Sequence, residues 1–208
     1  IAAFTTEQIT FLETADLAAL TAAQIVALSS TNMAQLSTAQ IVALTATQVT
    51  ALTTAQVAAL DTAQLQALET ADIKALTGAQ LAGLNTEQIS SLTTTQMAAI
   101  DTLDLRSLTN TQMAALTTDQ LLALGTPGIR AFTSAQFQAL TSDQLPSLST
   151  TQVAALDTSS IRAISATEVA ALGSDQITAL ATAQLLSFTT VQVVALTSDQ
   201  ISAVEATD

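Results

Sequence analysis

The chain repeats one pattern of apolar and polar positions every eight residues. In Thr53–Leu60, numbered 1 to 8, the rule is polar, Thr or Ser, small or acidic, Gln, aliphatic, variable, Ala and Leu. The 200 residues from 5 to 204 form 25 such octads without an insertion or deletion. Positions 5 and 8 are apolar in every octad, position 7 is nearly always small, and position 4 is Gln in 18 of the 25.

The spacing of the apolar positions favours short helices over strands. Positions 5 and 8 are an odd number of residues apart, so one face of a strand cannot hold both, whereas a spacing of three places them on one side of a helical turn. The many Ala residues also favour helix. A continuous α-helix is excluded because a repeat of eight drifts around a helix of 3.6 residues per turn. We therefore expect one short helix per octad, with a β-solenoid as the alternative.

Polar residues at positions 1 and 4 predict where each helix begins. Position 1 is Thr, Ser, Asp, Asn or Gly in most octads, and these residues cap helix N-termini. Gln three residues later can bond back to the cap's N–H in a capping box, as expected for Thr53 with Gln56. Glu13 and Glu69 are poor caps, so we expect Thr14 and Thr70 to take over there.

The charged residues support the same assignment. All 17 acidic residues lie at positions 1, 3 or 4, and all four basic residues, Lys74, Arg106, Arg130 and Arg162, lie at position 6. A helix dipole favours acid in the first turn and base in the last, by roughly 0.3–1 kcal/mol each. Pro127 at position 3 fits a first turn, but Pro146 at position 6 should distort its helix because it lacks an N–H.

A single octad cannot be stable alone, so the helices must stack. Burying two aliphatic side chains yields about 3–6 kcal/mol, whereas ordering eight residues costs roughly 12 kcal/mol. Asp16, Asp72 and Gly128 break the Gln column at intervals of 56 residues. An interval of 56 residues is seven octads. If seven octads make two turns, the chain is an all-α solenoid with about 3.5 octads, or about 28 residues, per superhelical turn. Duplication of a 56-residue block would give the same interval.

Residues 1–208 read as a single repeat array with no linker or shift in composition. The first four residues correspond to positions 5 to 8, and the last four to positions 1 to 4 of an octad. We therefore interpret the chain as a segment of a longer tandem-repeat protein. We expect its partners to be other copies of the same repeat, through self-association or through packing between neighbouring repeats of the array.

The composition leaves little room for chemistry. Without His or Cys, neither a nucleophile–base pair nor a Cys or His metal site can be built, so we predict no catalytic, cofactor-binding or metal-binding residues and no enzyme activity. Haem is excluded for the same reason, with only Met33, Met97 and Met113 as possible ligands. Calcium is the best candidate metal, because Asp and Glu oxygens suit it. The densest acidic clusters are Asp61/Glu69/Asp72 and Asp101/Asp104, but neither matches a calcium-loop spacing.

The net charge of -13 excludes several partners. With four basic residues in total, the chain cannot neutralise a phosphate backbone, so we expect no nucleic-acid binding. Polar residues interrupt every octad, so no apolar run approaches the ~20 residues of a membrane helix. Regular Thr rows at positions 1 and 2 suggest ice binding, but capping explains them more simply and charges interrupt them.

The motif x-[TS]-x-Q-[ILVM]-x-[AS]-L, repeated without gaps, resembles the Ala/Thr/Gln/Leu octapeptide arrays of very large bacterial cell-surface or secreted proteins. Such arrays occur in adhesin-like proteins and type I secretion substrates. The resemblance covers the whole chain. It implies an extracellular or cell-surface structural protein that forms a stalk, fibre, sheath or biofilm-matrix filament. The alternative is a binding module that presents repeated ligand, calcium or ice-binding sites along the solenoid.

Overall fold

The computed structural model describes residues 4–205, which form two compact units, Ile1–Leu108 and Thr109–Asp208. The boundary falls between two octads and does not shift the register of the repeat. Each unit is described by itself. Residues 1–3 and 206–208, which belong to the incomplete octads predicted at both ends, lie outside the described residues.

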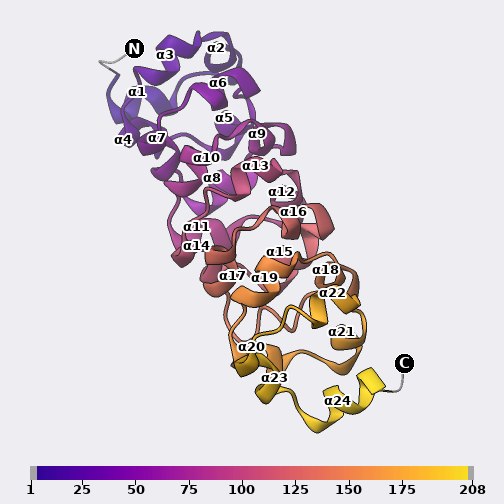
Figure 1. Cartoon of the computed structure of the whole chain (residues 1–208). Helices are drawn as coiled ribbons and strands as arrows, with labels where there is room; N and C mark the ends of the chain where they lie inside the picture. The colour runs from indigo at the N-terminus through magenta and orange to yellow at the C-terminus, as the bar shows by residue number, and fades with distance from the viewer. Residues whose placement is uncertain (1–3, 206–208) are drawn as a thin grey trace. The chain divides into compact units, whose positions relative to one another are not determined.

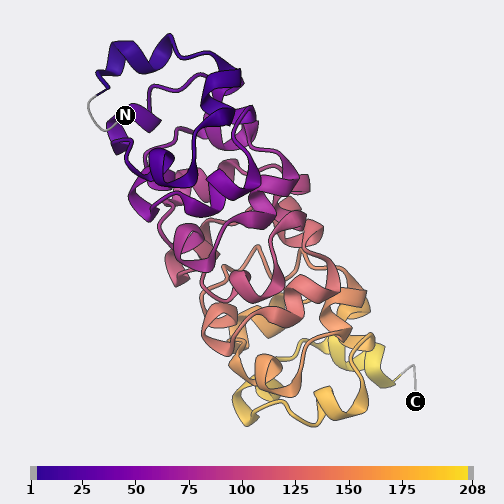
Figure 2. The same cartoon turned by 90° about the horizontal axis from the view of Figure 1, so that it is seen from above.

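Each unit consists of short helices that follow one another around a coil (Figures 1 and 2). The helices of the first unit are α1 (Thr6–Thr10), α2 (Thr14–Ala19), α3 (Ala22–Val26), α4 (Ser30–Met33), α5 (Thr38–Val42), α6 (Ala46–Ala51), α7 (Thr54–Ala58), α8 (Thr62–Ala67), α9 (Thr70–Ala75), α10 (Gly78–Ala82), α11 (Thr86–Ser91), α12 (Thr94–Ala99) and α13 (Thr102–Leu105). Those of the second are α14 (Asn110–Ala115), α15 (Thr118–Ala123), α16 (Gly125–Ala131), α17 (Ser134–Gln138), α18 (Thr150–Ala154), α19 (Thr158–Ala163), α20 (Ala166–Ala171), α21 (Ser174–Thr178), α22 (Thr182–Leu185), α23 (Thr190–Ala195) and α24 (Ser198–Glu205).

The helix breaks once per octad, as predicted. Before α7, Thr53 has extended backbone angles (φ -71°, ψ 155°), and its carbonyl accepts the helical bond from the Val57 N–H at 3.0 Å. The Leu60 N–H then closes the last turn on the Val57 carbonyl at 3.2 Å. At most octad junctions, extended residues end the helix because they cannot continue its i to i−4 bonds. The exception is the junction of α15 and α16, where Leu124 is in the αR region and Gly125 has a positive φ. No strand occurs in residues 4–205, so the helical alternative is confirmed over the β-solenoid.

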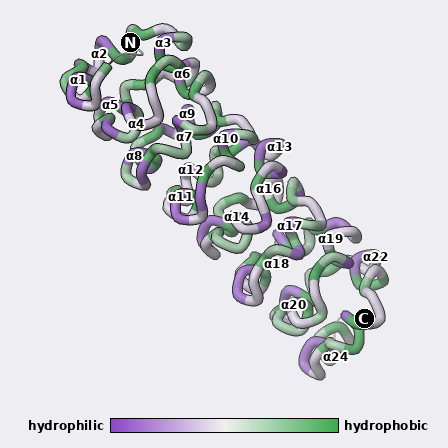
Figure 3. The backbone as a smooth tube through the Cα atoms, turned by 90° about the vertical axis from the view of Figure 1, so that its left-hand side faces the viewer, coloured by the Kyte–Doolittle hydropathy of each residue, from purple (hydrophilic) through white to green (hydrophobic). Residues whose placement is uncertain are grey.

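Positions 5 and 8 form the core of both units. The position 5 side chains Val57 and Val153 are 0% exposed, and the position 8 side chains Leu60 and Leu156 are 2% and 4% exposed. Along the tube of Figure 3, short hydrophobic and hydrophilic stretches follow one another. Each buried aliphatic side chain contributes about 1.5–3 kcal/mol, so the core of each unit is a sum of many small contributions. Near the end of the second unit, the position 5 residues Val193 and Ile201 are 51% and 44% exposed.

Helices three octads apart pack against each other within each unit. In the first unit α6 packs on α9 and α9 on α12, and in the second α20 packs on α23 and α21 on α24. Close approach occurs between position 2 of one octad and position 7 of the octad three further on. A Cβ added at Gly78 would collide with Ser107 Oγ, and one added at Gly83 would collide with Thr54 Cγ2. The small residues at position 7 therefore allow the approach that the sequence predicted.

The two prolines behave as predicted. Pro127 lies in the first turn of α16, where its missing N–H would have no helical partner. This helix follows Leu124 directly, and the positive φ of Gly125 (59°) allows the tight junction. Residues 141–148, which contain Pro146, form consecutive turns and no helix.

One prediction about the caps is wrong. Thr14 and Thr70 do not take over as caps, because both are the first helical residues of α2 and α9, and Glu13 and Glu69 occupy the cap positions. The Glu13 side chain makes no hydrogen bond to the first turn of α2. At the start of α9, the Glu69 N–H donates to the Asp72 carboxylate at 3.2 Å. The extended backbone at position 1, rather than the side chain, thus determines where the helix begins.

Candidate functional site

The most regular polar feature of the structure is the Gln at position 4. In α7, the Thr53 N–H donates to Gln56 Oε1 at 2.8 Å, and the Gln56 N–H donates to Thr53 Oγ1 at 3.2 Å. Asp61 and Gln64 make the same pair of bonds at 2.8 and 2.7 Å. The predicted capping box is therefore confirmed in both octads.

The same Gln side chain has a second role, which joins one superhelical turn to the next. Gln56 is 2% exposed, and its Nε2 donates to the carbonyls of Ile25 and Leu28, both at 2.8 Å. These residues precede Gln56 by 31 and 28 positions and are positions 5 and 8 of the octad four before it. One carboxamide thus satisfies its own helix start with its oxygen and the preceding turn's helix end with its nitrogen.

We call the position 4 side chains that make these bonds the glutamine ladder. A bond from Nε2 to the position 8 carbonyl 28 residues earlier, between 2.6 and 2.9 Å long, recurs in both units. It is made by Gln40, Gln48, Gln56, Gln64, Gln80, Gln88, Gln96, Gln144, Gln176, Gln184, Gln192 and Gln200. Because helices three octads apart pack together and each Gln reaches back four octads, the predicted turn of about 3.5 octads is confirmed.

Sequence reasoning found the capping role of Gln and missed its role between turns. A capping box accepts Glu as readily as Gln at its third helical position. Position 4 nevertheless contains Glu only once, at Glu168, although acidic residues are frequent at positions 1 and 3. The preference for an amide over a carboxylate is the signal that the side chain must also donate a hydrogen bond.

Two of the acidic residues at position 4 within the ladder, Asp72 and Glu168, are buried. Asp72 is 4% exposed and Glu168 is 6% exposed, and each accepts a bond from its cap N–H, at 3.2 Å from Glu69 and at 2.7 Å from Ser165. An ionised carboxylate has no proton to donate to the preceding turn. Burial raises the pKa of the Asp72 carboxyl above its ordinary value, the bond from the Glu69 N–H lowers it, and the Glu69 charge raises it.

Another interruption, at Ser160, opens a cavity of about 370 Å³ in the second unit. In the preceding octad Gln152 Nε2 donates to the carbonyls of Leu121 at 2.9 Å and Leu122 at 3.3 Å. The corresponding residues for Ser160 are Ile129 and Arg130, and both line the cavity. The space is therefore where a ladder carboxamide would lie, and we call it the Ser160 gap.

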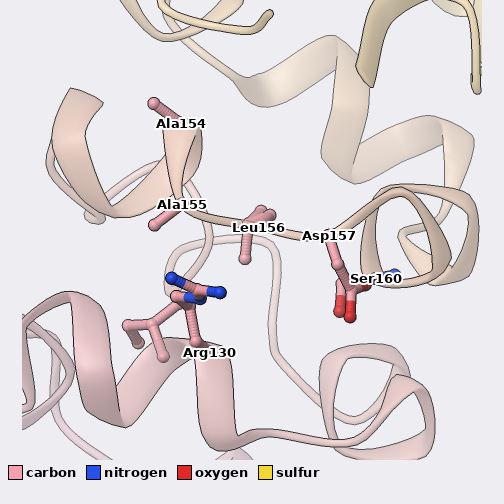
Figure 4. Close-up of a pocket in the computed structure, with 7 residues that line it drawn as sticks. Arg130, Ala154, Ala155, Leu156, Asp157 and Ser160 are labelled. Atoms are coloured by element: carbon pink, nitrogen blue, oxygen red, sulfur yellow. Dashed lines mark hydrogen bonds between the residues drawn. The ribbon is translucent and has the colours of Figure 1, made fainter. Parts of the chain in front are cut away.

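The start of α19 forms one wall of the Ser160 gap. The Asp157 carboxylate accepts bonds at 2.7 Å from the Ser160 N–H and from the Ser159 hydroxyl. These bonds, that of the Ser160 backbone first, hold the pKa of Asp157 below its ordinary value. Figure 4 shows Arg130 rising from α16 toward Ala155 and Leu156, with Asp157 and Ser160 on the other side of the space.

Three of the acidic residues considered as calcium ligands accept hydrogen bonds from backbone N–H groups instead. Asp61 caps α8, and Asp101 caps α13 by accepting the Leu103 N–H at 3.0 Å. Asp104 accepts the N–H of Gly78, 26 residues earlier, at 2.8 Å. A search of residues 4–205 finds no group of three or more acidic, His or Cys side chains that could hold a metal ion.

The methionines belong to the core and provide no candidate site. Met33, Met97 and Met113 are 0% exposed and belong to position 5 of the core. Within the described part of the chain, no helix is both long and apolar enough to cross a membrane.

Comparison with known proteins identifies the repeat. No curated protein sequence matches the chain. The pattern of the ALTTAQ repeat matches six times in tandem, at residues 9–46, 41–70, 65–102, 97–129, 121–150 and 147–182. These matches cover well over half of the sequence and agree with the octad in both register and composition, so the chain belongs to the ALTTAQ repeat family.

Proposed function

We propose that the chain is a structural repeat protein of the cell surface or extracellular space, serving as a stalk or fibre without catalysis. The observation that carries the proposal is the glutamine ladder. In each octad of the ladder, the Gln side chain bonds one turn to the turn before it, so the repeat can extend by adding similar turns. The resemblance to bacterial surface and secreted arrays supports the location.

The acidic surface fits this role. A net charge of -13 on 208 residues keeps copies apart in solution and favours solubility of a long array. No observation supports the calcium alternative. The described residues contain no cluster of three metal-ligating side chains, and Asp61 and Asp101 serve as helix caps. The ice-binding alternative also lacks support, because the Thr residues at position 1 serve as caps.

Small-angle X-ray scattering on a tandem duplicate tests the proposal. The chain starts at position 5 and stops at position 4 of the octad, so direct fusion of two copies keeps the register. A stalk predicts that the maximum dimension of the duplicate is about twice that of the single chain, because turns add along one axis. Compact packing instead predicts that the radius of gyration of the duplicate is only roughly 1.3 times that of the single chain.

A matched control uses the same fusion with four Gly and Ser residues between the copies. This insert shifts the octad by half a repeat, so the ladder cannot continue through the junction. We expect the control to contain two stalks joined by a flexible linker, with a smaller maximum dimension than the in-register fusion. If both fusions are equally compact, the stalk proposal is wrong.

A further inference from the structure

The Ser160 gap has the hydrogen-bonding groups of a ladder position without the ladder side chain. Ser160 is 4% exposed and too short to reach the preceding turn, where Gln152 in the neighbouring octad spans the same distance. Ile129 and Arg130, whose carbonyls correspond to those that accept from Gln152, therefore line a space of about 370 Å³ into which no carboxamide of this octad extends. The N–H of Asp157 likewise lacks the Gln oxygen that accepts the cap N–H in regular octads.

These groups define the chemistry of an occupant. In the regular octads the same arrangement binds one primary carboxamide, whose oxygen accepts the cap N–H and whose nitrogen donates to carbonyls 28 to 31 residues earlier. A carboxylate cannot replace it, because it has no proton for the carbonyls, and an ammonium ion cannot accept the cap N–H. The complementary group is a primary amide.

Arg130, in the wall of the gap, favours a particular group on the ligand at the end away from its amide. Arg130 is an exposed residue that lines the space and extends toward Ala155 and Leu156 (Figure 4). The nearest carboxylate on the opposite wall, Asp157, is already occupied by the Ser159 and Ser160 donors. A guanidinium at the open side favours a ligand with a carboxylate there.

We infer that the Ser160 gap is a binding site for a small ω-amido acid, whose primary carboxamide takes the place of the missing Gln side chain and whose carboxylate faces Arg130. The cavity has the size of a small-molecule site, at the lower end of the usual range of about 300–1,000 Å³. The inference is independent of the stalk proposal, since it depends only on contacts within the second unit.

Titration of the ¹⁵N-labelled chain followed by NMR tests the site. Succinamate, which has the amide and the carboxylate, is expected to shift the amide signals of Arg130, Asp157 and Ser160 with a Kd on the order of millimolar. Propionamide should bind about two- to fivefold more weakly, as expected for loss of one exposed ionic contact. N,N-dimethylpropionamide and succinate should leave these signals unchanged, because each lacks the primary amide.

Variants separate the site from nonspecific binding. Ser160→Gln supplies the missing carboxamide and should abolish the shifts, while Thr158→Gln adds the same side chain at an exposed neighbouring position and should leave them intact. Arg130→Gln should remove the difference between succinamate and propionamide. The inference is overturned if succinamate causes no shifts at these residues, if the dimethyl amide binds equally well, or if a folded Ser160→Gln chain still binds.

Discussion

Residues 141–148 and 157–164 depart from the regular octad in opposite ways. The first octad has no helix, because Pro146 lacks the N–H at position 6, yet Leu145 and Leu148 are 1% and 3% exposed, as in helical octads. Gln144 still donates to the carbonyls of Met113 and Leu116 at 2.9 and 2.6 Å. The ladder and the core therefore persist where the helix does not.

The second octad keeps its helix and loses the ladder. Residues 158–163 form α19, and Ile161 and Ile164 are buried at positions 5 and 8. With Ser160 in place of Gln, however, a cavity opens against the preceding turn. The comparison shows that helix formation inside an octad and connection between turns are separable, and that the connection depends on the side chain at position 4.

The largest effect should come from removing the ladder where no helix supports it. Gln144→Ala removes the acceptor of the Thr141 N–H and the side-chain donor to the carbonyls of Met113 and Leu116, of which Met113 keeps only the bond from the Leu116 N–H. An unsatisfied buried group costs about 1–3 kcal/mol, so we expect the free energy of unfolding to fall by roughly 2–4 kcal/mol in urea denaturation. Gln138→Ala, at an exposed position of α17, is the matched control and should change it by less than about 0.5 kcal/mol. Equal effects of both variants would show that the ladder contributes nothing.

Pro146→Ala should restore the missing helix without changing the ladder. Alanine returns the N–H at position 6 and has the highest helix propensity, so residues 142–147 should become helical. We expect more helical signal in far-UV circular dichroism and a gain of about 1–2 kcal/mol in unfolding free energy, less than the loss from Gln144→Ala. An unchanged spectrum would mean that packing, rather than Pro146, prevents the helix.

Much of this organisation was predictable from the octad, because its causes are local. The caps at position 1, the apolar positions 5 and 8 and the disruption by Pro146 follow from hydrogen bonding and sterics within eight residues. The 28-residue turn was also predictable, since Asp72 and Gly128 interrupt the Gln column at a fixed interval. For the bond from Gln56 to Ile25, the preference for Gln over Glu at position 4 indicates only the donor. Its partner was not predictable, because it is a backbone carbonyl, which every residue type has.

Glu168→Gln sharpens the comparison at a second interruption, in α20. The carboxylate of Glu168 accepts the Ser165 N–H at 2.7 Å but cannot donate to the preceding turn. An amide of the same length should keep the cap bond and add the donor, which increases the unfolding free energy by about 0.5–1.5 kcal/mol. Thermal unfolding of Glu168→Gln beside Ser165→Ala, which removes the cap oxygen and should be destabilising, measures both halves of the interaction. A destabilised Glu168→Gln would contradict the role of the amide.

The smallest effect concerns pH and the buried carboxyl of Asp72. Burial raises its pKa in the folded chain, so folding favours the protonated form. The stabilisation is therefore fully present below the pKa of the unfolded chain and is lost as pH rises through the higher pKa of the folded chain. We expect Asp72→Asn, which has no titrating group, to gain stability relative to the natural chain between these two pKa values and above, and none below. Urea midpoints of both chains, measured from acid to neutral pH, should diverge in that direction. Parallel curves would show that Asp72 does not titrate differently on folding.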